Sequence, residues 1–361
     1  MSAAALQLDY MPTAMLRAHP DRGWNDVLGL VGYTEPPLAD GTHVPVPVTA
    51  SRTPALISPD LCEVWRVTCS DAPVHLENGL NPRMGDSGAT VSYRYCEDLL
   101  FGSVTIDEHR FALEQAVPVA EPTHATALEQ ATLAAYGQIF EVLRSSGHGH
   151  LIRVWNYLPD INREAGGEER YRQFNGARQR AFRASGRPIA GNVPAASALG
   201  SPAGSPLSIY FLASREAPAL IENPRQTSAY HYPRRYGVHS PSFSRACMLA
   251  RSSGTNLFVS GTASIVGHES LHAGDVVAQT QETLANIAAL IEEANRMAGA
   301  PRYSLEGLKF KVYVRRPQDL EVIARTLTAA VRPDAPIVYL KADVCRTDLL
   351  VEVEATGGIP S

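Results

Sequence analysis

The 361-residue sequence is poor in cysteine and has no long apolar runs. Its five cysteines are odd in number and form no C-x-x-C pair, which argues against a disulfide framework or a cysteine-rich zinc site. No uncharged apolar run approaches the roughly 18–20 residues that a membrane-spanning helix needs. The opening residues, MSAAALQLDYMPT, lack the basic segment and apolar run of a secretory signal. We therefore expect a cytoplasmic protein with reduced thiols and no membrane partner.

Surplus positive charge is also missing. The chain has 32 basic and 37 acidic residues, a net charge of −5. A nucleic-acid-binding face needs an excess of basic residues, so we expect no nucleic-acid partner. Three of the basic residues are lysines, which leaves 32 − 3 = 29 arginines, and any single arginine is correspondingly weaker evidence for an anion site. A composition of 45% hydrophobic and 19% charged residues is typical of a globular enzyme, and the length suggests two domains.

Common cofactor and metal signatures are absent or misplaced. The chain has neither the G-x-G-x-x-G order of a dinucleotide-binding loop nor the G-x-S-x-G of a nucleophile elbow. His268 to His272 spells H-E-x-x-H, a zinc motif that requires a helix. Here the motif lies between Gly267 and Gly274, where we expect a loop. The sequence therefore predicts no cofactor and no metal.

Helix, strand and helix patterns recur in the same order in two halves of the chain. Setting residues 131–143 on residues 282–294 pairs Leu133 with Leu284 and Ile139 with Leu290. The predicted segments are 123–147, 151–158 and 168–183 in the first half, and 275–297, 308–314 and 318–331 in the second. This shared order favours a duplication of one folding unit.

The repeat predicts an α+β protein of two units, each a mixed or antiparallel sheet with helices packed on one face. We place the units at residues 1–215 and 216–361, with the active site in the second. We expect the first 50 residues to form an arm on the surface, and residues 186–206 to form a loop. Further strands are predicted at 61–68, 89–95, 99–105, 207–213, 257–265, 337–341 and 349–355.

The last predicted strand carries two carboxylates on one face. From Leu349 to Ala355 apolar residues alternate with the set that contains Glu352 and Glu354. Such a strand is either half solvated or catalytic, and the alternation alone does not choose between these readings, nor between the two glutamates.

Several segments resemble known families. The second half resembles the RidA (YjgF) superfamily in FVSG (258–261), AQTQ (278–281), Leu284 with Asn286, and VEVEA (351–355). A second set of segments comprises NYLPDIN (156–162), ERYRQFN (169–175), NPRQ (223–226), SAY (228–230) and SPSFSRA (240–246). With these segments, the chain from about residue 60 to residue 357 resembles the chorismatases, a RidA-derived family that removes pyruvate from chorismate.

The chorismatase resemblance implies an enzyme that acts on chorismate without a cofactor. It implies that Glu352 protonates the enolpyruvyl group, a task for a carboxylic acid whose pKa is raised by burial. Cys345 resembles the class that forms 3-hydroxybenzoate, with 4-hydroxybenzoate as a possible second product. The implied substrate-binding residues are Arg315, Arg245, Tyr230, Tyr157, Arg170, Arg178, Gly261 and Ala263.

Three alternatives stay open at this stage. Within the same chemistry, the protein would hydrolyse chorismate to a dihydroxycyclohexadiene carboxylate. A RidA-like imine deaminase usually has an arginine in a Pro-Ala-Arg context before the last strand, whereas residues 335–338 read APIV. A metabolite-binding protein without catalysis is the third. Because RidA proteins are trimers and this chain fuses two units, we expect a monomer or a trimer.

Overall fold

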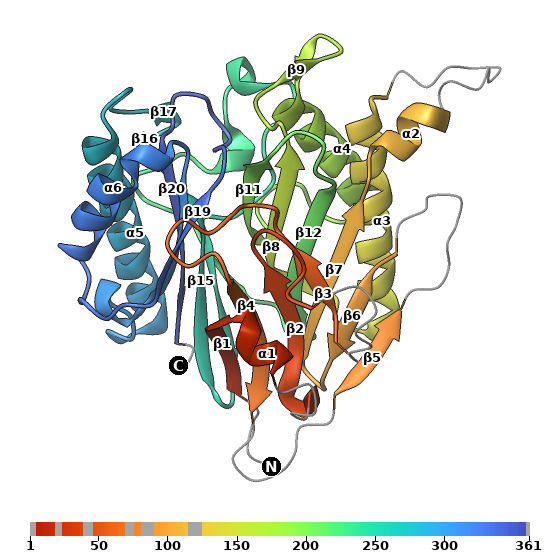
Figure 1. Cartoon of the computed structure of the whole chain (residues 1–361), viewed down its shortest axis with the longest axis horizontal. Coiled ribbons are helices and arrows are strands. Elements are labelled where there is room, and N and C mark those ends of the chain that lie inside the picture. Colours follow the sequence, from red (N-terminus) through yellow and green to blue (C-terminus); the bar gives the residue numbers. More distant parts are fainter. Residues whose placement is uncertain are drawn as a thin grey trace.

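The computed structural model describes residues 5–18, 24–38, 46–68, 76–80, 90–114 and 125–358. Its strands form three larger sheets, and the long helices lie on the outer faces of two of them (Figure 1). Cys69 lies outside the described residues. Of the predicted strand 89–95, the structure has a strand from Ser92 to Tyr95.

The first unit is a six-stranded mixed sheet with two long helices and one short helix. Its strand order is β11-β8-β12-β7-β6-β5, with β11 parallel to β8 and the other pairs antiparallel. The strands are β5 (Glu77–Leu80), β6 (Ser92–Tyr95), β7 (Leu99–Ile106), β8 (His150–Pro159), β11 (Ala195–Ser201) and β12 (Leu207–Ser214). The helices are α2 (His109–Glu114), α3 (Ala127–Ser146) and α4 (Arg170–Ala184).

Local sequence explains the bounds of helix α3. Thr126 and Glu129 form a capping box at its start, and Gly147 ends it with a φ of +75°, a conformation that favours glycine. Leu128, Ala135 and Ile139 are buried on the face that meets the sheet.

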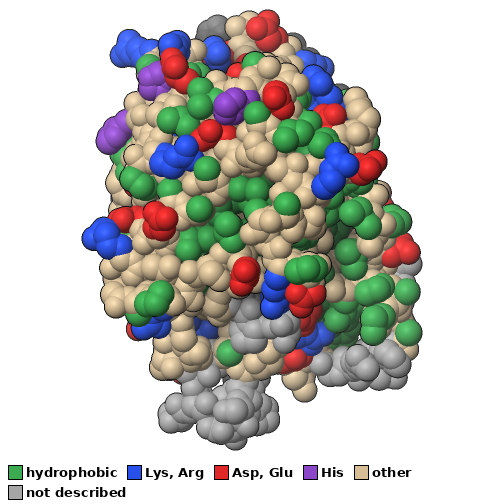
Figure 2. All heavy atoms as spheres, turned by 90° about the vertical axis from the view of Figure 1, so that its left-hand side faces the viewer, with side chains coloured by type: hydrophobic (Ala, Val, Ile, Leu, Met, Phe, Trp, Pro, Cys, Tyr) green, Lys and Arg blue, Asp and Glu red, His purple; other side chains and the backbone are tan. Residues whose placement is uncertain are grey.

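The second unit repeats this arrangement. Its sheet order is β13-β14-β15-β20-β18-β19, with β18 parallel to β19. The strands are β13 (Ala219–Ile221), β14 (Ala246–Arg251), β15 (Gly254–Thr262), β18 (Lys309–Val314), β19 (Ile337–Lys341) and β20 (Val351–Gly357), and the helices are α5 (Val276–Ala298) and α6 (Leu320–Thr328). The predicted pair of mixed sheets, each with helices on one face, is thereby confirmed. Figure 2 shows basic and acidic side chains interspersed over the face that carries α5 and α6.

The N-terminal residues form a third sheet, so the predicted surface arm is wrong. Strands β1 (Ala5–Pro12), β2 (Val27–Gly32), β3 (Val48–Ala50) and β4 (Leu61–Thr68) pair in the order β1-β4-β2-β3, and α1 covers Thr13–Arg17. All six residues of β2, VLGLVG, are buried. An uninterrupted apolar run of this kind is typical of a strand that is covered on both faces.

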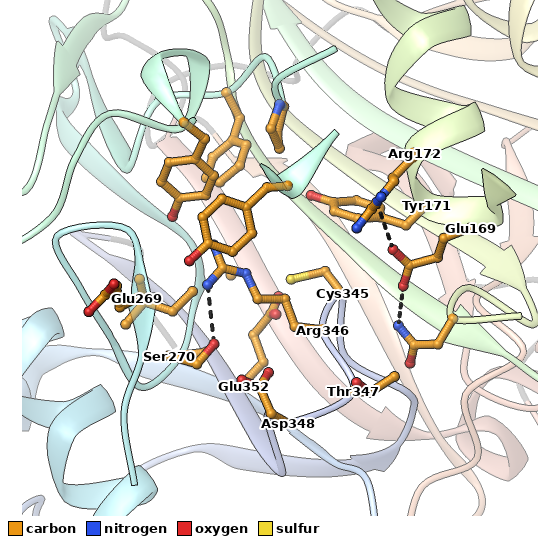
Figure 3. A pocket seen from close by; sticks show the side chains of 18 of the residues that line it. Glu169, Tyr171, Arg172, Glu269, Ser270, Cys345, Arg346, Thr347, Asp348 and Glu352 are labelled. Carbon is orange, nitrogen blue, oxygen red and sulfur yellow. Dashed lines mark hydrogen bonds and ion pairs between the residues drawn. The ribbon is translucent and has the colours of Figure 1, made fainter. Parts of the chain in front are cut away.

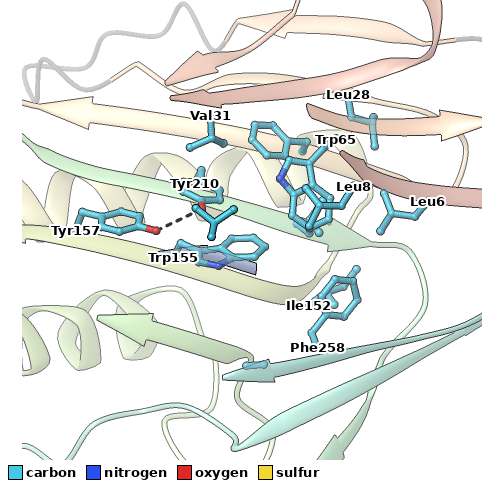
Figure 4. Packing of buried hydrophobic residues seen from close by; sticks show 14 of the residues in the cluster. Leu6, Leu8, Leu28, Val31, Trp65, Ile152, Trp155, Tyr157, Tyr210 and Phe258 are labelled. Carbon is cyan, nitrogen blue, oxygen red and sulfur yellow. Dashed lines mark hydrogen bonds between the residues drawn. The ribbon is translucent and has the colours of Figure 1, made fainter. Parts of the chain in front are cut away.

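Aromatic and aliphatic side chains from all three sheets meet in one core (Figure 4). Trp65 of β4 lies 5.6 Å from Trp155 of β8 between ring centroids, and Trp155 stacks on Tyr210 of β12 at 4.6 Å. Phe258 of β15 brings the second unit into the same cluster. Burial of such large rings is the main stabilising contribution, about 25 cal/mol for each Å² of apolar surface removed from water.

The remaining elements are short. They are the hairpins β9 (Glu164–Ala165) with β10 (Glu168–Glu169) and β16 (Ile265–Val266) with β17 (Glu269–Ser270), and 3₁₀ turns at Trp24–Asp26, Ala229–His231, Arg234–Tyr236, Leu305–Gly307 and Pro317–Asp319. The prediction of a loop over 186–206 is wrong in part, because β11 lies within it. Among the described residues, no helix is long and apolar enough to cross a membrane.

Candidate active site

A pocket of about 890 Å³ opens between the two units. One side comes from the connection between β8 and α4 and from the start of α4. The other side comes from the segment before β14, from β15 to β17, and from residues 345–352. It is lined by Asn162, Glu164, Gly167, Glu168, Glu169, Tyr171, Arg172, Tyr232, Tyr236, Pro241, Phe243, Arg245, Gly261, Ala263, Ile265, Glu269, Ser270, Cys345, Arg346, Thr347, Asp348 and Glu352. Its size suits a small organic ligand.

Glu352 lies in this pocket on the inner face of β20, opposite Tyr313 of β18. Its side chain is buried, and no described residue donates a hydrogen bond to its carboxyl group. Burial, and next the negative charge of Glu354, raise the pKa of Glu352 to about 8. The carboxyl group is therefore protonated at neutral pH and is able to donate a proton.

Glu354, two residues further along the same face, has the opposite environment. Its carboxylate accepts hydrogen bonds from Arg153 Nη2 at 2.7 Å, Trp155 Nε1 at 2.7 Å and Ser197 Oγ at 2.8 Å, and Lys311 Nζ lies 2.9 Å away. Burial alone would raise the pKa of Glu354, but the cations Lys311 and Arg153 outweigh it and lower the pKa. Glu354 is thus an ionised structural group, which separates the two glutamates.

Gly261 gives the Glu352 carboxyl its space. A Cβ atom at this position would lie 1.9 Å from Glu352 Oε1, so any side chain would displace the acid. The Gly261 N–H donates to Ser197 Oγ at 3.0 Å, and the same hydroxyl donates to Glu354. Ser197 therefore links the backbone beside one glutamate to the carboxylate of the other.

Cys345 lies on the same side of the pocket as Glu352, with its sulfur between Tyr171 and Arg346 (Figure 3). Burial, and next the neighbouring Glu352, raise the pKa of the thiol to about 12. Cys345 is therefore a neutral thiol at physiological pH and not a thiolate nucleophile. The pKa of Tyr171 is also raised well above its ordinary value, by burial and by Cys345 and Glu352, so its hydroxyl remains a hydrogen-bond donor.

Besides Arg172, which forms an ion pair with Glu169 at 3.5 Å, three arginines present guanidinium nitrogens toward this region. Arg245 and Arg346 line the pocket, and Arg178 lines a cavity of about 30 Å³ that shares Glu352 and Cys345 with it. Within the described part of the chain, four buried nitrogens of these groups have no partner: Arg178 Nε and Nη2, Arg245 Nε and Arg346 Nη2. Buried unpaired donors are costly, so the arrangement suits an anionic ligand.

The structure places four other predicted ligands outside the pocket lining. The Tyr157 hydroxyl bonds to Tyr313 at 2.9 Å in the core. Arg170 donates to Glu108 at 2.7 Å and to the Pro159 carbonyl at 2.8 Å. Arg315 donates to five protein oxygens, and Tyr230 lies edge-on to His231 in the turn Ala229–His231. By contrast, Glu352, Cys345, Arg245, Gly261 and Ala263 come together in the pocket, with Arg178 in the adjoining cavity.

Sequence reasoning missed Arg346, Tyr171, Tyr236 and Ser197. Arg346 directly follows Cys345, but the abundance of arginine concealed this signal. Its Cζ lies 4.1 Å from the centroid of the Tyr236 ring, and its Nη1 donates to the His268 carbonyl and to Ser270 Oγ. Ser197 lies on β11, in a segment predicted to be a loop.

The H-E-x-x-H segment does not form a helix. Glu269 and Ser270 form β17, and His272 has a φ of +59°. His272 Nε2 lies 3.3 Å from Glu282, whereas His268 Nδ1 lies 3.0 Å from Arg235. Among the described residues, no three His, Cys, Asp or Glu side chains are grouped so as to hold a metal ion.

Comparisons with known proteins agree with this geometry. Residues 81–213 match the family described as chorismatase FkbO/Hyg5-like, N-terminal. A 3-hydroxybenzoate synthase of Streptomyces hygroscopicus is 45% identical over 234 residues, which are 62% of this chain and 68% of the relative. A chorismatase of the same organism is 36% identical over 346 residues, which are 93% of this chain and 90% of the relative.

A solved structure extends the comparison to the whole fold. The crystal structure of a chorismatase superposes with a TM-score of 0.79 at 32% sequence identity, covering 99% of this chain and all of that chain. Similarity of sequence and of fold thus extends over nearly the full length, including both sides of the pocket. The chain belongs to the chorismatase family.

Proposed function

We propose that this protein is a chorismatase that converts chorismate into pyruvate and 3-hydroxybenzoate. The relatives named chorismatase and 3-hydroxybenzoate synthase support this reaction. The observation that carries the proposal is the environment of Glu352: a buried carboxyl with a pKa of about 8 that faces a pocket with unpaired guanidinium donors. An acid and cationic donors are what the cleavage of a dianionic enol ether requires.

The arginines bind the two carboxylates of chorismate. Arg346 and Arg245 offer unpaired N–H groups in the pocket, and Arg178 offers two more in the adjoining cavity. The planar guanidinium group matches a carboxylate, and a hydrogen bond to a charged group contributes about 1.5–3 kcal/mol. Arg346 stacks on Tyr236 and is therefore held in one orientation.

Glu352 begins the reaction by protonating the terminal methylene of the enolpyruvyl group, which gives an oxocarbenium ion. The C4 hydroxyl oxygen then attacks C3 of the ring, the bond between C3 and the ether oxygen breaks, and that oxygen leaves with pyruvate. The hydroxyl proton returns to the Glu352 carboxylate. The resulting arene oxide opens to 3-hydroxybenzoate, so the acid is regenerated and no water is consumed.

Cys345 directs this outcome in preference to hydrolysis. Its neutral thiol lines the pocket beside Glu352 and keeps water away from the oxocarbenium carbon, and it is placed to relay the hydroxyl proton. Access of water would instead give the dihydroxycyclohexadiene carboxylate. The related 3-hydroxybenzoate synthase favours the aromatic product for this chain as well.

The test is incubation of the wild-type protein and of Glu352→Gln with chorismate, followed by chromatography of the products. We expect 3-hydroxybenzoate and pyruvate in equal amounts from the wild type, and binding without turnover in the variant. Hydrolysis would appear as the dihydroxycyclohexadiene carboxylate. Turnover that persists in Glu352→Gln would refute the role of this acid, and an unreacted wild-type mixture would refute the function.

We also propose how the chain is organised and where it works. The division near residue 215 separates two sheets of similar order, and the third sheet joins their shared core, which favours a monomer. Size-exclusion chromatography with light scattering would detect a trimer instead. The free thiols of Cys62, Cys96, Cys247 and Cys345 suit a reducing cytoplasm, which fractionation of the source cells would test.

A further inference from the structure

Arg315 does not line the pocket, yet it is bound to the segment that does. Its Nε donates to the Leu349 carbonyl at 2.7 Å, and its Nη2 donates to the carbonyls of Val344 at 2.8 Å and Arg346 at 2.9 Å. Its Nη1 donates to Asp343 Oδ1 at 2.9 Å and to Asn162 Oδ1 at 3.1 Å. These five bonds use all five N–H groups of a guanidinium, so none is left for a substrate.

The contacted residues define a short segment, 343–349, that we call the thiol loop. It connects β19 to β20 and carries Cys345 and Arg346 into the pocket. Among the described residues, the other bonds of the thiol loop are fewer and more scattered. The Asp343 N–H and carbonyl pair with Gly200, the Leu349 N–H donates to the Arg346 carbonyl, and Gln279 Nε2 donates to the Asp348 carbonyl at 2.8 Å; the Arg346 side chain adds two bonds described below. Three of its backbone carbonyls converge on the single guanidinium of Arg315.

We propose that Arg315 is a positioning residue that fixes the thiol loop and thereby selects the product of the reaction. The part about product choice rests on the proposed function, whereas the part about the loop does not. Asn162 extends the connection to the first unit, because it accepts from Arg315 at 3.1 Å and lines the pocket itself. One side chain therefore sets the position of Cys345 relative to both units.

The same loop reaches the far wall of the pocket. The Arg346 side chain donates to the His268 carbonyl and to Ser270 Oγ, and it stacks on Tyr236. Release of the loop would therefore loosen the β16–β17 hairpin as well as the thiol. Lysine can replace Arg315 only in part, because its three donors radiate from one atom and cannot reach all the carbonyls spread along the loop.

Hydrogen–deuterium exchange of the protein without substrate tests the loop directly. We expect Arg315→Gln to speed exchange in peptides covering 343–350 by about tenfold or more, since the loss of even two bonds has that effect. Exchange in helix α5 should not change, which excludes general unfolding. Arg316→Gln is the matched control, because Arg316 is the exposed neighbour of Arg315. Unchanged exchange at 343–350 in a folded Arg315→Gln protein would overturn the proposal.

Chorismate turnover by the same proteins tests the consequence. Arg315→Gln should release a smaller share of 3-hydroxybenzoate and more hydrolysed product, Arg315→Lys should restore the share only in part, and Arg316→Gln should match the wild type. An unchanged product share in Arg315→Gln would refute the selecting role. Should Arg315→Gln fail to fold, Asp343→Ala removes one of the five acceptors and should give a smaller increase in exchange. Faster exchange in a protein whose wild type leaves chorismate untouched would uphold the loop and reject the function.

Discussion

Replacing Glu352 by Gln should make the protein more stable in alkaline solution, although it removes the proposed acid. The pKa of Glu352 rises from 4.5 in the unfolded chain to about 8 in the folded protein. A group whose pKa is raised by folding stabilises the protein fully below its unfolded pKa, and this stabilisation is lost as the pH rises through the folded pKa. Glutamine cannot ionise, so the variant does not suffer this loss.

The magnitude follows from proton linkage between pH 6 and pH 9. With pKa values of 4.5 and about 8, the free energy of unfolding of the wild type falls relative to that of the variant by on the order of 2 to 3 kcal/mol over this interval. Glu352 is only 4% exposed, so solvent screening reduces the effect little.

Urea denaturation of both proteins at pH 6, 7, 8 and 9, followed by circular dichroism, measures the difference. Glu292→Gln is the matched control, because Glu292 is exposed on helix α5 and the substitution is chemically identical. We expect the free energy of unfolding of Glu352→Gln, relative to that of the wild type, to grow between pH 6 and pH 8 and to level off by pH 9, where the folded wild type is ionised as well. The corresponding difference for Glu292→Gln should stay flat. The raised pKa would be refuted if the difference in free energy of unfolding between Glu352→Gln and the wild type changed by less than about 0.5 kcal/mol from pH 6 to pH 9, which is the usual size of a surface effect.

Four further substitutions test separate parts of the site. Gly261→Ala should reduce kcat about 100-fold or more, because the new methyl group displaces the acid; near-normal kcat would contradict this. Cys345→Ala should lower the share of 3-hydroxybenzoate measured by chromatography, and an unchanged share would exclude the role of the thiol. Arg346→Ala should raise KM about tenfold or more, whereas the control Arg316→Gln should not. Lys311→Met should cost about 3–5 kcal/mol in urea denaturation, because it removes the cation that the buried carboxylates of Glu63 and Glu354 share; a loss below about 1 kcal/mol would contradict the buried network.

Strands and helices with a clear period were predictable from the sequence. The predicted strands 61–68 and 337–341 have the bounds of β4 and β19, and the predicted helix 275–297 differs from α5 by one residue at each end. Helix α5 buries one regular face, whereas β4 and β19 are short apolar runs with consecutive buried residues; in each case the hydrophobic pattern is visible locally. The ordered repeat then indicated two units of sheet and helices.

Strand β11 was not predictable in the same way. Apart from Leu199, its sequence, AASALGS, is made of small residues with little preference for a strand. It forms because its backbone pairs with β8 in parallel, and because close packing against β15 requires small side chains. This information lies in distant segments of the chain.

The distinction between the two glutamates also depends on distant residues. Alternation placed Glu352 and Glu354 on one face, but Glu354 is ionised because Arg153, Ser197 and Lys311 converge on it from three other strands. The role of Arg315 was concealed for a similar reason. A motif indicates an arginine near a site, whereas its partners decide whether it binds substrate or backbone.

The rate of 3-hydroxybenzoate formation from chorismate, measured as kcat/KM from pH 6 to pH 9.5, tests the central claim most directly. Glu352 must carry its proton to start the reaction, and its pKa in the free protein is about 8. We predict a constant kcat/KM at neutral pH and a decline that approaches tenfold per pH unit above about pH 8. A rate that stays level or rises up to pH 9.5 would contradict protonation by Glu352.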